Sequence, residues 1–198
     1  MRLGILISGR GSNFLAIADA IAAGKLAAEI AVVICNRADA AGITAARARG
    51  LNAIVLASKG TSREEHESDI AKTLADAKVD MVVLAGYMRL LGTRLLEDFA
   101  GRIVNIHPSL LPAFPGLNAQ GQALAYGVKV TGCTVHFVTA GLDEGPIIVQ
   151  RTVPVLAGDT EESLSARILE QEHIAYPEAL HLIATGRVRI DGRRVVIG

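Results

Sequence analysis

The sequence has little cysteine, no long apolar run and no excess of either charge. Cys35 and Cys133 are its two cysteines, and they lie in separate strand-like segments without a CxxC pair. A disulfide framework is therefore not expected. Lys and Arg together number 20, as do Asp and Glu. No net field attracts nucleic acid or an anionic membrane, so neither is an expected partner.

Signals for membrane insertion and export are also missing. No apolar stretch approaches the roughly 20 residues that a membrane helix needs. The first segment, MRLGILISGRGS, has too short an apolar part for a secretory signal and lacks a small-residue cleavage pattern. These absences predict a soluble cytoplasmic protein.

The composition is typical of a compact globular fold, because 51% of the residues are hydrophobic and only 20% are charged. Apolar runs alternate with helical patterns, as expected for parallel strands covered on both faces. The runs span residues 3–7, 30–35, 53–56 and 79–85 and lead to a fifth strand at 103–107. This order predicts an α/β fold with a doubly wound, mostly parallel sheet and right-handed crossovers. No repeat or composition shift appears, so residues 1–198 are expected to form one domain.

The rhythm changes after the fifth strand. Residues 111–127 are rich in proline and glycine and predict a long loop with one short helix, a candidate lid. Two strands follow at 129–138 and 146–155, and a hairpin around Asp191-Gly192 ends the chain. A capping box at 159–162 opens a long helix that Pro177 is expected to interrupt.

The segment 103–116, IVNIHPSLLPAFPG, presents an amide and an imidazole where a buried strand stops. Asn105 and His107 alternate with apolar residues, and Pro108 then ends any ladder pairing. Ligands of open α/β sheets bind outside the carboxyl ends of the strands. An amide donor and a titratable ring suit a reaction that develops negative charge on a carbonyl oxygen. A hydrogen-bonded polar pair without a catalytic role explains the spacing equally well.

A glycine turn, SGRGSN, joins the first strand to the first helix. Such a turn aims backbone N–H groups and the helix dipole at an anion. Gly9 and Gly11 are present, but Phe14 replaces the third glycine of the dinucleotide fingerprint, and no Gly-Lys-Ser/Thr follows. A monophosphate is therefore the predicted ligand. A tight turn with a helix capped by Ser12 or Asn13 is the alternative.

Other polar residues have ordinary structural explanations. Asp143 lies in a Gly-rich turn, where turn chemistry alone accounts for an acid. Arg89 is a candidate ligand group with a surface ion pair as the alternative, Met88 and Leu90 are candidate core residues, and His136 in mid-strand is interpreted as structural. No His pair has metal-ligand spacing and no base accompanies a cysteine, so neither a metal nor a covalent nucleophile is expected.

Taken together, six motifs resemble those of the folate-dependent phosphoribosylglycinamide formyltransferases. They read ISGRGSN, LAGYMRLL, NIHPSLLPAFPG, GCTVHFV, LDEGPIIVQ and QEHIAYP, and the resemblance runs from Leu3 to about Gly186. It implies the formyltransferase fold, a Rossmann-like domain with a mixed seven-stranded sheet and antiparallel C-terminal strands. Residues from 1 to about 100 would then form a phosphate-binding half. Those from about 101 to 198 would form a folate and catalytic half.

The resemblance also implies an activity. A formyl group passes from the co-substrate 10-formyltetrahydrofolate to the amine of 5-phosphoribosylglycinamide in de novo purine synthesis. The amine attacks directly and forms a tetrahedral intermediate, without a metal. The expected partners are these small molecules, and the expected state is a monomer or weak homodimer.

Three sets of residues match the site of this family. The catalytic residues are Asn105, His107 and Asp143. The residues that bind phosphoribosylglycinamide are Gly11, Ser12, Asn13, Gly86, Pro108 and Glu172. The residues on the folate side are Arg63, Met88, Arg89, Leu90, Leu91, Asn105, Thr139, Ala140, Gly141, Leu142 and Asp143. The chain departs from some bacterial members at Asn118 and Gly121, where those carry histidine and arginine.

Three rival functions remain to be separated. A methionyl-tRNA formyltransferase is expected to carry a C-terminal RNA-binding domain and a basic surface. A formyltetrahydrofolate hydrolase is expected to carry an additional N-terminal regulatory domain. A catalytically idle phosphate-binding module is the third, and the presence of amide, imidazole and carboxylate together argues against it.

Overall fold

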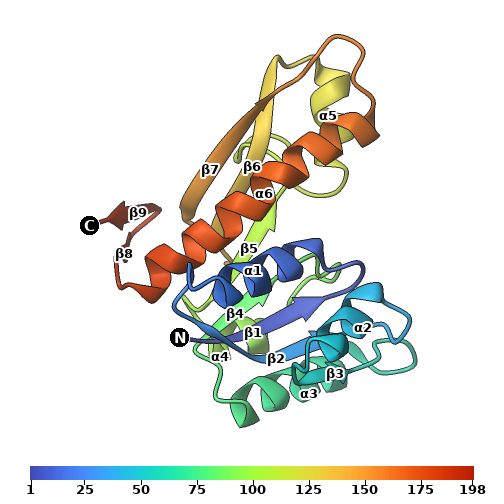
Figure 1. Cartoon of the computed structure of the whole chain (residues 1–198), viewed down its shortest axis with the longest axis vertical. Helices are drawn as coiled ribbons and strands as arrows, with labels where there is room; N and C mark the ends of the chain where they lie inside the picture. Colours follow the sequence, from blue (N-terminus) through green and yellow to red (C-terminus); the bar gives the residue numbers. More distant parts are fainter. The chain divides into compact units, whose positions relative to one another are not determined.

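The computed structural model describes residues 1–198, which form two compact units, Met1–Val104 and Asn105–Gly198 (Figure 1). A seven-stranded sheet has the order β3-β2-β1-β4-β5-β6-β7, and β8 pairs separately with β9. The sheet is mostly parallel with an antiparallel pair, β6 and β7, at one end, which confirms the predicted fold class. No helix is both long enough and apolar enough to cross a membrane.

The first unit alternates strands and helices as the apolar runs predict. Its elements are β1 (Arg2–Ile7), α1 (Ser12–Ala22), β2 (Glu29–Cys35), α2 (Ala41–Ala48), β3 (Ala53–Val55), α3 (Arg63–Asp76), β4 (Met81–Leu84) and α4 (Thr93–Asp98). Strand β1 pairs in parallel with β2 and β4, so the loops that follow β1 and β4 leave the sheet side by side. Ser8 joins them, because its N–H donates to the Gly86 carbonyl (3.1 Å) and its Oγ accepts from the Met88 N–H (2.9 Å).

Strand β5 (Ile103–His107) begins at the end of the first unit and continues into the second. The later elements are α5 (Ala119–Tyr126), β6 (Val130–Phe137), β7 (Ile147–Pro154), α6 (Glu161–Ala184), β8 (Val188–Asp191) and β9 (Arg194–Ile197). Helix α6 runs along the antiparallel pair β6 and β7 and packs on both strands (Figure 1). Its inner stripe includes Leu164 and Ile168, which are fully buried.

The expectation that Pro177 interrupts the last helix is wrong. Helix α6 continues through Pro177 to Ala184, although proline gives no N–H to the preceding turn. Tyr176, directly before the proline, and Ala179, two residues after it, are fully buried. Because packing of an apolar face supplies most of a helix's stability in proteins, this burial holds the helix together across the missing hydrogen bond.

The start of α6 also differs in detail from the expected capping box. Thr160 is the N-cap, and it exchanges hydrogen bonds with Ser163 rather than with a glutamate. Asp159 instead accepts from the Arg167 guanidinium and from the Leu156 N–H (2.7 Å). The Arg167 hydrogen bonds are the main reason why the pKa of Asp159 is lowered from its usual value.

We expect Thr160→Ala to lower the free energy of unfolding by about 1 kcal/mol, because the first turn of α6 loses its side-chain acceptor. Urea unfolding followed by circular dichroism measures the change. Ser165→Ala, within the same helix, is the matched control and should not destabilise the protein, since alanine favours the helix interior. Equal losses in both variants would contradict a capping role for Thr160.

Candidate active site

The glycine turn after β1 forms the amino end of α1. Gly11 is the N-cap of this helix and has φ +72°, in the left-handed region where glycine carries no steric penalty. Ser12 and Asn13 are the first helical residues, and no side chain caps the helix. The alternative of a helix capped by Ser12 or Asn13 is therefore wrong. The first turn carries no acidic residue, which leaves its N–H end suited to an anion.

Gly42, at the start of α2, supports this turn and was not anticipated. Its N–H donates to the Gly9 carbonyl at 3.0 Å. A Cβ at this position would lie 2.8 Å from the Gly9 oxygen and 2.7 Å from Ile7 Cδ1. Only glycine therefore lets α2 approach the turn this closely. A single sequence gives no signal for this contact, because Gly42 lies inside a helical pattern.

The loop after β4 exposes apolar side chains. Met88 is 71% exposed and Leu90 is 70% exposed, so the interpretation of these two residues as core is wrong. Gly86 opens the loop with φ +78°. Arg89 forms no ion pair, and the surface-pair explanation for this residue is also wrong.

Arg63, at the start of α3, ties this loop to the helix. Its Nε lies 3.0 Å from Glu67 Oε1, and its Nη2 donates to the Leu90 carbonyl at 3.3 Å. The Glu67 side chain is largely buried, whereas Arg63 is half exposed. The guanidinium thus holds the backbone beside Leu91 while part of it faces solvent.

In the second unit, the end of β5 places His107 against the loop that follows. The ring is buried, and its Nε2 lies 2.8 Å from the Phe114 carbonyl oxygen. Because a carbonyl oxygen only accepts, Nε2 carries the proton. The other nitrogen, Nδ1, faces the Asp143 carboxylate at 3.4 Å. An imidazolium satisfies both partners, since both of its nitrogens donate.

Asp143 reaches this site from the turn between β6 and β7. Its backbone has φ +53°, and its side chain is only 10% exposed. The Oδ2 atom accepts from the Gly116 N–H at 2.8 Å as well as facing His107. The carboxylate therefore joins the loop after β5 to the loop after β6. Turn chemistry alone does not explain an acid that points inward in this way.

His136, in mid-strand on β6, belongs to the same cluster. Its Nε2 lies 3.4 Å from Asn105 Nδ2 and 3.7 Å from Asp143 Oδ1, and its Nδ1 lies 2.9 Å from the Phe137 carbonyl. Burial lowers the pKa of His136 below its usual value of 6.5, and Asp143 only partly opposes this. The structural interpretation from sequence missed these contacts. Polar residues at alternate positions of an apolar strand, Thr134 and His136, were the available signal.

A buried hydrogen-bond network anchors the start of the long loop after β5. Thr134 Oγ1 donates to the Ser109 carbonyl (2.7 Å) and accepts from the Leu111 N–H (3.0 Å). Gln150 Nε2 donates to the Leu111 carbonyl at 2.9 Å. This base of the candidate lid is therefore fixed to β6 and β7. Its far end is held by Asn118, whose amide contacts Glu161 at 3.3 Å.

The remaining candidates of the second unit occupy three places. Pro108 follows β5 directly, and Thr139 to Leu142 lead along the turn to Asp143. Leu142 is 55% exposed. Glu172 lies on α6 and is buried, so its carboxylate is shielded from bulk water.

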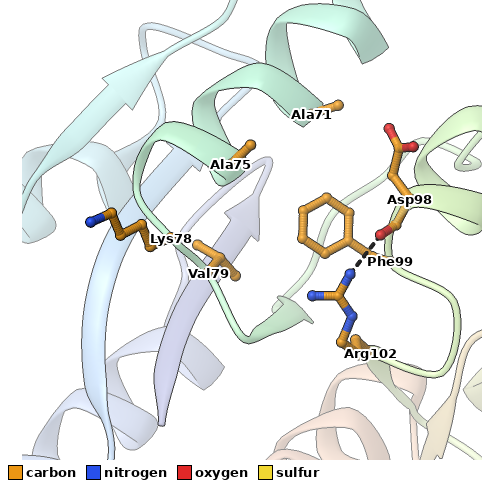
Figure 2. A pocket seen from close by; sticks show the side chains of 7 residues that line it. All are labelled: Ala71, Ala75, Lys78, Val79, Asp98, Phe99 and Arg102. Atoms are coloured by element: carbon orange, nitrogen blue, oxygen red, sulfur yellow. Dashed lines mark hydrogen bonds between the residues drawn. The ribbon is translucent and has the colours of Figure 1, made fainter.

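A separate pocket of about 330 Å³ contains none of the candidate residues (Figure 2). It is lined by Ala71, Ala75, Lys78, Val79, Asp98, Phe99 and Arg102. In Figure 2 the Arg102 guanidinium points at the Asp98 backbone carbonyl, to which it donates at 2.6 Å. Val79 precedes β4, so this pocket lies at the amino ends of the strands, whereas the candidates of this unit follow the carboxyl ends.

Comparison with known proteins agrees with the resemblance. The family model described as formyl transferase matches residues 1–180. The phosphoribosylglycinamide formyltransferase of Escherichia coli is 42% identical over 203 residues, covering 98% of this chain and 96% of that protein. The trifunctional purine biosynthetic protein adenosine-3 of Drosophila pseudoobscura pseudoobscura is 47% identical, and the match covers 95% of this chain but only 14% of that longer protein.

Solved structures share the whole fold. The glycinamide ribonucleotide transformylase 1 of Symbiobacterium toebii is 56% identical, with a TM-score of 0.97, over 100% of this chain and 93% of that one. A formyltetrahydrofolate deformylase of Pseudomonas syringae is 27% identical, with a TM-score of 0.94, over 99% of this chain and 65% of that one.

Burial of His136 predicts a pH dependence of stability. Its pKa is lower in the folded protein than its usual 6.5, so the unfolded chain binds more protons below that pH. Above pH 6.5 the folded protein keeps all of the stability that the neutral ring contributes. As the pH falls through the lowered pKa, the free energy of unfolding decreases by up to about 1.4 kcal/mol per pH unit. Urea unfolding between pH 7.5 and 5 measures this slope.

His136→Gln should reduce the slope by the contribution of one proton. His181→Gln, which removes an exposed histidine of α6, is the matched control and should keep the slope of the unmodified protein. An unchanged slope in His136→Gln would contradict the assignment of a buried neutral ring.

Proposed function

Because the chain belongs to the formyl transferase family, we propose that it transfers the formyl group of 10-formyltetrahydrofolate to the amine of 5-phosphoribosylglycinamide. The proposal places the chain in de novo purine synthesis, in the cytoplasm. We also propose that residues 1–198 act as one formyltransferase domain, as a monomer or weak homodimer. Only the two small-molecule substrates are required.

The assembly of the catalytic cluster is the observation that carries the proposal. Asn105 and His107 lie at the end of β5 and Asp143 lies in the turn between β6 and β7, yet their polar atoms meet around the carboxylate and the His136 ring. A relative of almost the same length bears the name phosphoribosylglycinamide formyltransferase. The geometry and this name favour the same chemistry.

The proposed reaction needs donors to an oxygen and a route for one proton. The substrate amine, in its neutral form, forms a bond to the formyl carbon, and the carbonyl electron pair moves to oxygen. The Asn105 amide and the His107 imidazolium donate to this oxyanion. The intermediate then collapses, the bond to N10 of the folate breaks, N10 takes a proton, and the former amine nitrogen loses one.

His107 supplies its donor in competition with the protein's own backbone. In this structure its Nε2–H donates to the Phe114 carbonyl. A substrate oxyanion is a stronger acceptor than a carbonyl, because charge-assisted hydrogen bonds are shorter and stronger. We therefore propose that the oxyanion replaces the Phe114 carbonyl as the partner of Nε2, while Asp143 stabilises the positive ring from the Nδ1 side.

The two substrates would engage different loops. Backbone N–H groups of Gly11, Ser12 and Asn13 would bind the ribose phosphate, and the buried Glu172 carboxylate would accept from the ribose hydroxyls. Gly86 and Pro108 would contact the glycinamide.

The folate is an extended aromatic ligand and would contact exposed apolar side chains. Met88, Leu90 and Leu142 are large apolar residues that are more than half exposed. Pockets for such ligands are lined mainly by apolar groups, with a few polar groups that fix the orientation of the ligand. Arg63 and Arg89 would supply these polar groups here. Leu91, Asn105 and the turn from Thr139 to Asp143 complete the proposed folate contacts.

One assay separates the proposal from its rivals. Protein is mixed with 5-phosphoribosylglycinamide and 10-formyltetrahydrofolate, and release of the deformylated folate is followed by absorbance. Release that depends on the amine supports the transferase. Release without the amine would instead indicate a deformylase like the Pseudomonas syringae relative. Absence of release both with and without the amine would overturn the proposed function.

We expect Asp143→Asn to lower kcat by about 10²-fold or more while KM for either substrate changes less than about threefold. Asparagine keeps an oxygen for the Gly116 N–H but removes the charge beside His107. Steady-state kinetics measure the effect. Glu144→Gln, on the exposed neighbouring residue, is the matched control and should be nearly silent. Comparable losses in kcat and in substrate affinity would contradict the proposed role.

We expect Gly42→Ala to raise KM for 5-phosphoribosylglycinamide about tenfold, which corresponds to about 1.4 kcal/mol of binding. A methyl group 2.8 Å from the Gly9 oxygen must displace the proposed phosphate turn. The KM for the folate should change little, because the turn is assigned only to the phosphate. Thr44→Ala, on the exposed face of α2, is the control. Equal changes for both substrates would contradict this assignment.

A further inference from the structure

We propose that His136 is a positioning residue that fixes which end of the Asn105 carboxamide faces the reacting formyl group. The inference rests on the proposed transferase function, and it assigns to His136 a role beyond packing. Asn105 can donate to an oxyanion only through its NH₂ end, so the orientation of this amide determines whether the donor is present.

The first step concerns the tautomer of His136. Its Nδ1 lies 2.9 Å from the Phe137 carbonyl oxygen, which has no proton to give. Nδ1 must therefore carry the proton. In the neutral ring this leaves a lone pair on Nε2, so Nε2 acts as an acceptor.

The second step concerns the partner of that lone pair. Nε2 lies 3.4 Å from Asn105 Nδ2, so the ring accepts one N–H of the carboxamide. A flipped carboxamide would place its oxygen against the lone pair, which sets two acceptors against each other. The neutral ring therefore selects the orientation in which the NH₂ end points into the cluster. The second N–H of this group remains for the oxyanion.

The third step concerns the charge state of the ring. Two titratable groups face it, Asp143 through Oδ1 at 3.7 Å and His107 across the same carboxylate. A protonated His136 would aim an N–H at the Asn105 amino group and another positive charge at Asp143. It would then favour the flipped carboxamide and compete with His107 for the carboxylate. Burial, the main cause of the lowered pKa, prevents this by favouring the neutral form.

Two substitutions separate positioning from packing. In His136→Gln the amide oxygen can stand near the place of Nε2 and accept from Asn105, so kcat should fall by less than about threefold. In His136→Phe the ring is kept but the acceptor is lost, so kcat should fall by about 10- to 100-fold. The KM values of both substrates should stay within about threefold in each variant, because Asn105 is proposed to stabilise the transition state and not the bound substrates.

His66→Phe is the matched control for losing a buried histidine. His66 is as buried as His136, and its Nε2 also bonds a backbone carbonyl, that of Leu56, at 2.9 Å. A purely structural role for His136 predicts that the two phenylalanine variants lose stability alike and that neither loses kcat specifically. A kcat in His136→Phe equal to that of His66→Phe would overturn the proposal, as would a His136→Gln variant as slow as His136→Phe.

A measurement without substrates tests the same contact directly. The side-chain amide signals of Asn105 and the ring nitrogens of His136 can be followed by ¹⁵N NMR. We expect a neutral Nδ1–H ring at pH 7.5, and Asn105 amide signals that shift as His136 titrates below pH 6.5. The shift should be absent in His136→Gln.

Asn105 amide signals that change neither with the substitution nor with the pH would contradict the proposed contact. The NMR measurement does not depend on catalytic turnover. An inactive protein whose amide signals follow His136 would therefore refute the transferase while leaving the His136–Asn105 contact established.

Discussion

The Asp143 carboxylate is the group on which the arrangement of the second unit depends. One of its oxygens accepts from the Gly116 N–H and faces His107, and the other faces His136. A largely buried carboxylate needs such partners, because an unpaired buried charge is costly. The same contacts that satisfy this charge also bring the loop after β5 to the turn after β6. The contacts that stabilise the buried Asp143 carboxylate are therefore the same contacts that assemble the cluster.

The two histidines beside this carboxylate have opposite proposed roles, and their backbone partners account for the difference. Each ring donates one proton to a backbone carbonyl, His107 through Nε2 to Phe114 and His136 through Nδ1 to Phe137. His107 then presents its remaining nitrogen to the carboxylate, which suits a second proton. His136 presents its remaining nitrogen to an amide donor, which suits a lone pair. One carboxylate thus serves a proposed proton donor and a proposed acceptor at once.

In the first unit, the glycine turn after β1 is the proposed site for the phosphate of the substrate. The start of α1 has no side-chain cap, and Gly11 reaches the required left-handed backbone without strain. The contact between Gly42 and the Gly9 carbonyl holds the turn from behind. Rigid support of this kind lowers the entropy lost on binding, which is the usual benefit of a preorganised site.

The sequence by itself determined the strands, most helices and the types of residue at the candidate site. Apolar runs, proline and glycine act over a few residues, so the order of β1 to β5 and the end of β5 at Pro108 could be predicted. Tertiary structure alone decided that Asp143 meets His107, that His136 joins them, that Gly42 backs the glycine turn and that α6 survives Pro177. Each of these depends on packing between segments distant in the chain. A local pattern can mark a polar residue in an apolar strand, as it does for His136, but it does not identify the partner, because the partner of a buried polar atom is chosen by the fold around it.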